Sequence, residues 1–127
     1  MHCVIETHAF RGVAKGLGLT EDELLKMLCH FAQHPQSGDV IPGTGGARKT
    51  RFAGRGKGKS SAFRVISYYG GEDVPVFLLD VYAKGERINL TASEKAELKK
   101  ILNGLAPDWR ESVRRKVSEM KKTEVAS

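Results

Sequence analysis

The sequence lacks several features that would place it in a large class of proteins. Its 127 residues include two cysteines, Cys3 and Cys29, which form no metal-type spacing with each other or with the four histidines. No apolar run approaches the ~18 residues of a membrane-spanning helix, and the longest, residues 74–81, is interrupted by Pro75 and Asp80. The N-terminus shows no secretory pattern. We therefore expect a cytoplasmic protein without membrane contact, whose two thiols are free and buried.

Acidic side chains are absent from residues 43–65, although the whole chain carries 15 of them. The same window holds seven of the 21 basic side chains, while the segments before and after it are nearly balanced in charge. A local excess of cations attracts polyanions, so this distribution indicates contact with a polyanion at one place. The seven basic residues are Arg48, Lys49, Arg51, Arg55, Lys57, Lys59 and Arg64.

Two capping boxes mark helix starts, because a threonine hydroxyl and a glutamate three residues later satisfy free backbone donors. Thr20 and Glu23 precede an apolar repeat that predicts a helix over residues 21–33. Thr91 and Glu94 open a helix with an apolar stripe as far as residue 105, and a short helix is expected over residues 9–16. Pro107 suits the first turn of a separate last helix. Its apolar side would comprise Trp109, Val113, Val117 and Met120.

Residues 47–53, 62–69 and 76–83 are three candidate strands, and residues 2–8 alternate loosely enough for an edge strand. The connection over residues 38–46, GDVIPGTGG, contains too much glycine and proline for a helix. Short loops join antiparallel neighbours, so the three strands should form a meander. The pattern as a whole predicts an α+β fold.

The segment AGRGKGKSS at residues 53–61 resembles the end of a nucleotide-binding P-loop. A P-loop needs a first glycine where Ala53 stands and a helix after Ser60, because the helix N-terminus holds the phosphates. Here a strand is predicted after the loop. Nucleotide hydrolysis is therefore disfavoured, and the cationic loop must serve another phosphate.

A cationic sheet surface is the better interpretation of this region. Lys49 and Arg51 are two residues apart on one strand, so their side chains leave the same face. Arg64 joins them if the next strand pairs suitably, and Lys57 and Lys59 lie on the adjoining loop. The alternative from charge alone is a solvated basic face without chemistry.

These segments, taken in order, resemble the RelE/HigB superfamily of bacterial type II toxins, particularly its HigB-like branch. The resemblance covers roughly residues 3–105. It rests on the glycine-rich GDVIPGTGG, the strand ARKTRF, the loop GRGKGKS, the strand RVI and the sequence YAKGE. We expect a toxin domain over residues 1–106 and a basic helical extension over residues 107–127, which the resemblance does not reach.

The resemblance implies N-terminal helices packed on a curved antiparallel sheet. It also implies an mRNA endonuclease that acts in the ribosomal A site without metal or other cofactor. In such enzymes the RNA 2′-hydroxyl attacks the adjacent phosphate, and basic side chains stabilise the charge that develops. The resemblance further implies a cognate antitoxin, expected to carry a helix-turn-helix domain.

Carried over by position, the resemblance assigns four catalytic candidates. Arg51 and Arg64 would stabilise the transition state, Lys49 would transfer a proton and Lys84 would contact phosphate. Tyr82 could stack on a base, although half-buried packing is the more common role of a tyrosine next to a strand end. The RNA-binding candidates are Arg48, Arg55, Lys57, Lys59 and Tyr82.

Other functions remain open at this point. A ParE-type toxin shares the fold and poisons DNA gyrase without cutting RNA, and a degenerate member would bind RNA only. His30 and His34 lie one helical turn apart and could bind a metal, but no third ligand is evident, and a solvated helix face is the simpler explanation.

Overall fold

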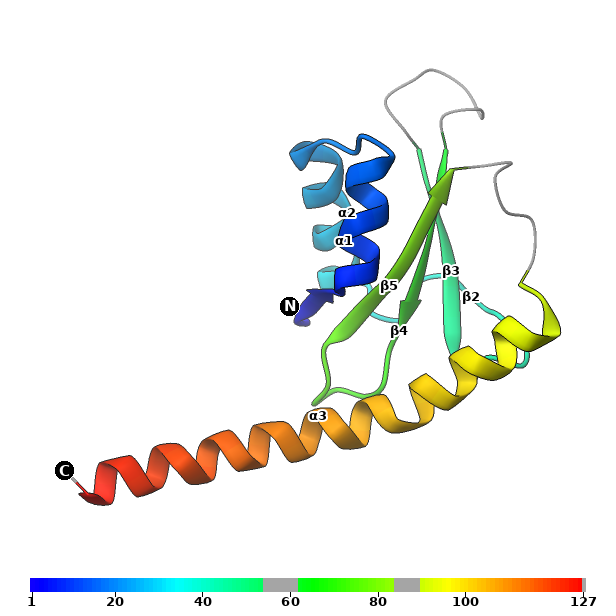
Figure 1. The fold of residues 1–127 in the computed structure, drawn as a ribbon. Helices are drawn as coiled ribbons and strands as arrows, with labels where there is room; N and C mark the ends of the chain where they lie inside the picture. The colour runs from blue at the N-terminus through cyan, green and yellow to red at the C-terminus, as the bar shows by residue number, and fades with distance from the viewer. Residues whose placement is uncertain (54–61, 84–89, 127) are drawn as a thin grey trace.

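The computed structural model describes residues 1–53, 62–83 and 90–126. Two N-terminal helices, a five-stranded sheet and a long C-terminal helix make up these residues (Figure 1). The strands are β1 Val4–Glu6, β2 Asp39–Val40, β3 Ala47–Phe52, β4 Phe63–Tyr68 and β5 Val76–Ala83. The helices are α1 His8–Gly16, α2 Glu21–Gln33 and α3 Ala92–Ala126. The predicted α+β class is confirmed.

The sheet has the strand order β1-β5-β4-β3-β2 and is mixed, whereas an antiparallel sheet was expected. β2, β3, β4 and β5 pair antiparallel, but β1 pairs parallel with β5, with Val4 opposite Val76. Parallel neighbours need a long connection, and here α1, α2 and three strands lie between them in the chain. The two-residue strand β2 was not predicted, because it lies within the glycine-rich connection.

The main core lies between one face of the sheet and the two N-terminal helices. Phe10 of α1 and Phe31 of α2 are fully buried against a sheet surface that includes Val65, Leu78 and Val81. The predicted capping box is present at the start of α2, where the Thr20 hydroxyl accepts a hydrogen bond from the Glu23 amide at 3.2 Å. The helix therefore begins where the sequence indicates and presents its apolar side to the sheet.

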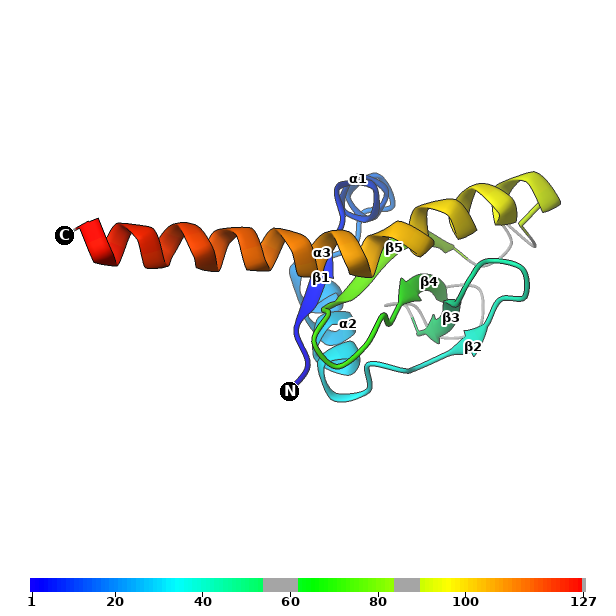
Figure 2. The same cartoon turned by 90° about the horizontal axis from the view of Figure 1, so that it is seen from below.

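α3 lies on the opposite face of the sheet and continues beyond it (Figure 2). Leu102 packs with Ala47 and Ile66, and Ala106 packs farther along with Phe77. The separate last helix expected from Pro107 is wrong, because α3 is continuous through this proline. Proline removes one helical hydrogen bond, but apolar contacts on both sides of it hold the helix to the same surface.

Both cysteines are free, as expected, but they are exposed rather than buried. Cys3 precedes the edge strand β1, and Cys29 lies on the side of α2 that faces away from the core. Within the described part of the chain, no helix is both long enough and apolar enough to cross a membrane.

Candidate functional site

The pairing of three strands brings Arg51, Arg64 and Tyr82 into one row. Arg51 of β3 lies directly opposite Arg64 of β4, and Arg64 lies opposite Tyr82 of β5. Residues that face each other in an antiparallel pair project from the same face of the sheet. We call these three residues the site row. It lies on the α3 face of the sheet, because Tyr82 packs with Leu98 and Leu102 of α3. The row is close to the ends of β3 and β5 (Figure 1).

A second row lies next to the site row on the same face. Lys49, two residues before Arg51, is opposite Ile66 on one side and Asp39 of β2 on the other. Ile66 in turn is opposite Asp80 of β5, next to a register shift in which Leu79 is the extra residue. Lys49 therefore has an arginine beside it on its own strand and a carboxylate across from it on the edge strand.

Arg64 is more enclosed than Arg51, its partner across the strands. Its side chain is partly buried, and its Nη1 atom is inaccessible to water without a hydrogen-bond partner among the described residues. A buried guanidinium nitrogen without an acceptor is unfavourable. It also faces the exposed cation Arg51 across the strands, and like charges in that position repel. An anion bound between the two arginines would offset their repulsion.

Arg48 projects from the opposite face and has a structural contact. It alternates with Lys49 along β3, and its Nη1 donates a hydrogen bond of 3.0 Å to the carbonyl of Gly38. Gly38 has φ +95°, and a Cβ there would lie 2.7 Å from the Lys49 carbonyl oxygen, so only glycine fits. Arg48 thus helps to hold the segment that carries Asp39 against β3, and its predicted RNA contact stays a prediction.

Four predicted residues lie outside the described part of the chain. Arg55, Lys57 and Lys59 belong to residues 54–61, and Lys84 belongs to residues 84–89. Their roles stay predictions, like those of the residues in the two rows.

Tyr82 is half-buried and packs with the apolar cluster of Ile66 and Leu98. It therefore has the packing role that the sequence left open, and it also lies beside Arg64 in the site row. The two roles are compatible, because one edge of the ring can pack while the other faces the row.

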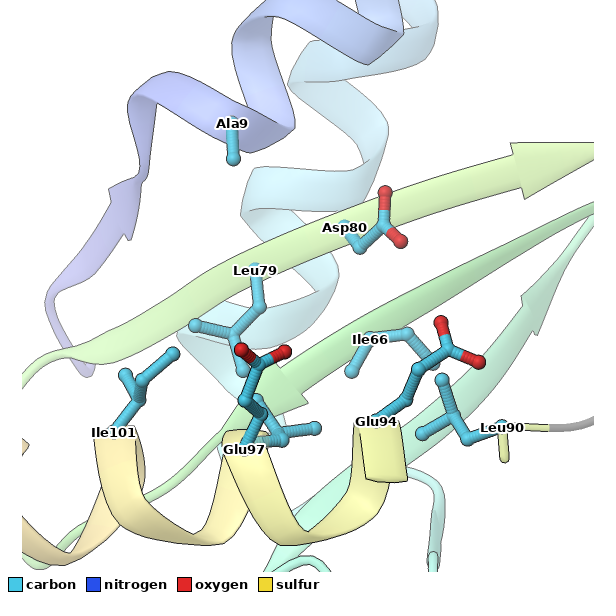
Figure 3. A pocket seen from close by; sticks show the side chains of 9 residues that line it. Ala9, Ile66, Leu79, Asp80, Leu90, Glu94, Glu97 and Ile101 are labelled. Atoms are coloured by element: carbon cyan, nitrogen blue, oxygen red, sulfur yellow. The ribbon is translucent and has the colours of Figure 1, made fainter. Parts of the chain in front are cut away.

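A pocket of about 330 Å³ lies between the sheet and the first turns of α3 (Figure 3). Its floor is apolar and includes Ile66 and Leu79, and carboxylates of Asp80, Glu94 and Glu97 surround it. Carboxylates repel phosphate, so an RNA backbone is not expected to enter this pocket. The part of this face that would attract phosphate is the site row, with the strand ends next to it.

The histidine pair also has a structural explanation. His30 Nε2 lies 2.7 Å from the Ser37 hydroxyl, and its ring packs edge-on against Phe31 and Phe52. Burial, and secondly the nearby His34, lower the pKa of His30. Among the described residues, no group of three His, Cys, Asp or Glu side chains is arranged to hold a metal. The expectation of a simple solvated face fits His30 poorly, because its side chain is partly buried.

The family model for the RelE toxin of the RelE / RelB toxin-antitoxin system matches residues 2–125. The chain belongs to the RelE toxin family. The match extends past residue 105, where the resemblance in sequence motifs ended, and includes most of α3. Membership in the RelE family implies a cognate antitoxin as partner.

Among solved structures, the RelE-family chain is similar to a mutant of E. coli toxin RelE in the free state. The identity is 20%, the alignment covers 77% of this chain and 93% of that one, and the TM-score is 0.47. The assignment to the RelE family rests on the family model and not on this likeness.

Two acidic residues near the site were not singled out as functional from the sequence. Asp39 and Asp80 stand at the two ends of the row that contains Lys49. Asp39 lies in the unpredicted strand β2, so only the pairing of strands reveals its position. Asp80 lies two residues before Tyr82 in the same register, so alternation places it on the Tyr82 face, but its position in the row with Lys49 requires the pairing of β3, β4 and β5.

Proposed function

We propose that this RelE-family toxin is a ribosome-dependent mRNA endonuclease of the HigB-like branch, acting in the cytoplasm. The observation that carries the proposal is the cross-strand pair of Arg51 and Arg64, two cations that lie directly opposite each other on neighbouring strands. Two arginines held directly opposite each other without an anion repel, and a phosphate with developing charge is the ligand that they fit.

The reaction needs stabilised charge and two proton transfers. The RNA 2′-hydroxyl loses its proton and attacks the adjacent phosphorus, the bond to the 5′-oxygen breaks, and that oxygen gains a proton. The products are a cyclic phosphate and a free 5′-hydroxyl. Arg51 and Arg64 would hold the non-bridging oxygens, whose negative charge grows in the transition state.

Lys49 is the proposed proton donor to the leaving 5′-oxygen. Asp39 lies across from it on β2, and a bound phosphate would lie beside it. A charged lysine donates hydrogen bonds and a proton but cannot accept one. The base that takes the 2′-hydroxyl proton is therefore a different group.

The other predicted residues complete the substrate surface of this proposal. Tyr82 would support a base beside the phosphate, and Lys84 would contact a neighbouring phosphate. Contacts to the RNA backbone are proposed for Arg48, Arg55, Lys57 and Lys59. Each phosphate contact of this kind adds to the salt dependence of binding. The proposed partners are the ribosome with its message, and an antitoxin with a helix-turn-helix domain that silences the enzyme.

Primer extension on a defined message in a purified translation system tests the proposal. The native protein, Arg64→Met and the control Arg11→Met are compared, with and without ribosomes. Methionine keeps the length and packing of the Arg64 stem while it removes the charge, and Arg11 is an exposed cation of α1. We expect ribosome-dependent cuts within codons for the native protein and for Arg11→Met, and their loss in Arg64→Met.

Two results would contradict the nuclease. An intact message in a stalled translation reaction would indicate an RNA-binding member without cleavage. Normal translation together with inhibited DNA gyrase would indicate a ParE-type toxin. Cleavage that survives in Arg64→Met would place the chemistry elsewhere on the molecule.

A further inference from the structure

The C-terminal part of α3 repeats the apolar pattern of its buried part. Leu102, Ala106 and Trp109 form the buried set: the first two are 1% and 5% exposed, and the Trp109 ring lies 6.0 Å from that of Phe77. Eleven residues later, the same spacing of four and three places Val113, Val117 and Met120 on the helix. Eleven residues make three helical turns, so a straight helix points both sets in the same direction.

The second set is not covered by the body of the protein. Val113, Val117 and Met120 are 43%, 44% and 68% exposed, and we call them the exposed stripe. α3 projects beyond the sheet in both views, so the exposed stripe lies on a single helix in solvent (Figures 1 and 2). Scattered apolar residues are normal on a surface, but a stripe in line with a buried one indicates a face that packs against something.

The projecting helix is fixed where it leaves the sheet. Arg110 Nε donates a hydrogen bond of 2.7 Å to Asp73 Oδ2, and its Nη2 donates one of 2.9 Å to Asp73 Oδ1. This two-pronged ion pair joins α3 to the turn before β5, beside the contact of Trp109 with Phe77. The direction of the exposed stripe is therefore set before any partner binds, which lowers the entropy cost of binding.

Cations border the exposed stripe on both sides. Residues 110–122 contain six basic and two acidic side chains. By helical geometry, Lys116 lies along one border, and Arg114 and Lys121 lie along the other. Glu111 forms an ion pair with Arg114 at 3.0 Å. That border stays positive because Lys121 also lies along it. A second copy of this chain would place cations against cations, so the charge disfavours self-pairing along the stripe.

We propose that the exposed stripe docks an amphipathic helix of a partner protein, one whose apolar side chains are bordered by carboxylates. Apolar contact in line with the buried set supplies the attraction, and the opposite charges along the borders fix the partner and its alignment. RNA is a poorer occupant, because phosphate contacts require the cations but give no role to three aligned apolar side chains. The inference does not depend on the proposed nuclease activity.

Synthetic peptides of about 20 residues, long enough to form helices, serve as probes for the full-length protein. One carries leucines at the spacing of the stripe with glutamates along the borders, and its matched control carries lysines in place of the glutamates. We expect the acidic peptide to bind, as followed by fluorescence anisotropy at low salt, and the basic peptide not to bind. Failure of the acidic peptide to bind, or equal binding of both peptides, would overturn the proposal.

Paired variants separate the stripe from the general charge of the helix. Val117→Gln with Met120→Gln should weaken acidic-peptide binding about tenfold, whereas Ser112→Gln with Ser118→Gln, off the stripe, should change it less than about twofold. Lys121→Glu, on a border, should weaken binding about fivefold, and Lys122→Glu, on the far side of the helix, less than about twofold. These positions are exposed, so circular dichroism should show unchanged folding.

Two further outcomes would replace the proposed partner with another. Sedimentation that shows a dimer, lost in the Val117→Gln and Met120→Gln double variant, would identify a second copy as the occupant. A short RNA duplex that binds more tightly than the acidic peptide, and is weakened equally by Lys121→Glu and Lys122→Glu, would identify a phosphate surface. Either result contradicts docking of an acidic helix, and neither bears on whether message is cleaved.

Discussion

α1 and α2 cover one face of the sheet from the end marked by Val76 of β5 to the end marked by Phe63 of β4. α3 covers the other face only at one end. Where α1 and α2 cover it, the first face presents apolar side chains such as Val65, Leu78 and Val81. The second begins as an apolar surface at Ala47 and Ile66 and ends in the cations Arg51 and Arg64. The two surfaces belong to the same strands and differ only in the alternate residues that they present.

The difference shows how a small domain can separate stability from chemistry. Apolar burial on the α1/α2 face can hold the sheet together without help from the open end of the other face. That open end is then free to carry charges that repel one another, and such unfavourable arrangements are typical of functional sites. We therefore expect substitutions on the α1/α2 face to change stability, and substitutions at the open end of the other face to change activity.

The largest effect on stability is expected from Phe31→Ala. Phe31 is fully buried in the α1/α2 core, and removal of a buried phenylalanine side chain costs about 3–5 kcal/mol because it leaves a cavity. Urea unfolding followed by circular dichroism measures this change. Leu25→Ala on the same helix is the control; Leu25 is 58% exposed, so its loss should cost less than about 1 kcal/mol. Equal losses in the two variants would contradict the assignment of the core to this face.

Arg64→Met should separate activity from stability. If the proposed mechanism holds, loss of one preorganised donor to the transition state lowers cleavage by roughly 10²–10³-fold, or about 3–4 kcal/mol. The free energy of unfolding should stay the same or rise by about 1 kcal/mol, because a buried donor without a partner among the described residues is removed. Urea midpoints and primer extension on the same preparations measure both effects. A clear loss of stability would show that Arg64 supports the fold instead.

The elements of the fold were predictable where the signal is local. Both capping boxes form, with Thr91 Oγ1 accepting from the Glu94 amide at 3.1 Å as Thr20 does from Glu23, and β5 has the predicted bounds. Pairings between distant segments were not predictable. The parallel contact of β1 with β5 depends on how the helices pack, and the continuity of α3 through Pro107 depends on contacts with the sheet.

The candidate site was likewise predictable only where the signal lies within one strand. Alternation along β3 is enough to place Lys49 and Arg51 on one face, and it also places Arg48 on the other, which the sequence prediction of an RNA contact did not take into account. The position of Arg64 opposite Arg51 requires the register between β3 and β4, which the intervening glycine-rich loop does not reveal. Burial of the Arg64 guanidinium is likewise a property of the assembled sheet.

A smaller loss of stability, arising on the α1/α2 side, is expected when the pH is lowered. Burial, followed by the proximity of His34, lowers the pKa of His30, so the unfolded chain binds a proton at His30 more readily than the folded protein does. The neutral ring therefore contributes stability that is fully present above the unfolded pKa of about 6.5 and is lost as the pH falls below it. Urea midpoints between about pH 5 and pH 7 measure this loss.

His30→Gln should flatten the pH profile, because glutamine keeps a polar side chain near Ser37 but does not titrate. His8→Gln is the control, since His8 is exposed at the start of α1. A profile that is unchanged by His30→Gln, or flattened equally by His8→Gln, would assign the pH dependence to other groups.

The smallest change in the free energy of unfolding is expected from Arg51→Gln on the open end of the α3 face. This change is a gain, whereas Phe31→Ala in the core causes a loss. Arg51 is exposed and lies directly across from Arg64, so removal of its charge relieves repulsion and should raise the free energy of unfolding by about 0.5 kcal/mol at low salt. Salt screens exposed charges, and the gain should therefore shrink as the ionic strength approaches about 1 M. Urea unfolding at two salt concentrations measures this, with Arg11→Gln on α1 as the control. If Arg51→Gln destabilises the protein at low salt, the two arginines do not repel each other in the folded state, and the electrostatic argument for an anion between them is wrong.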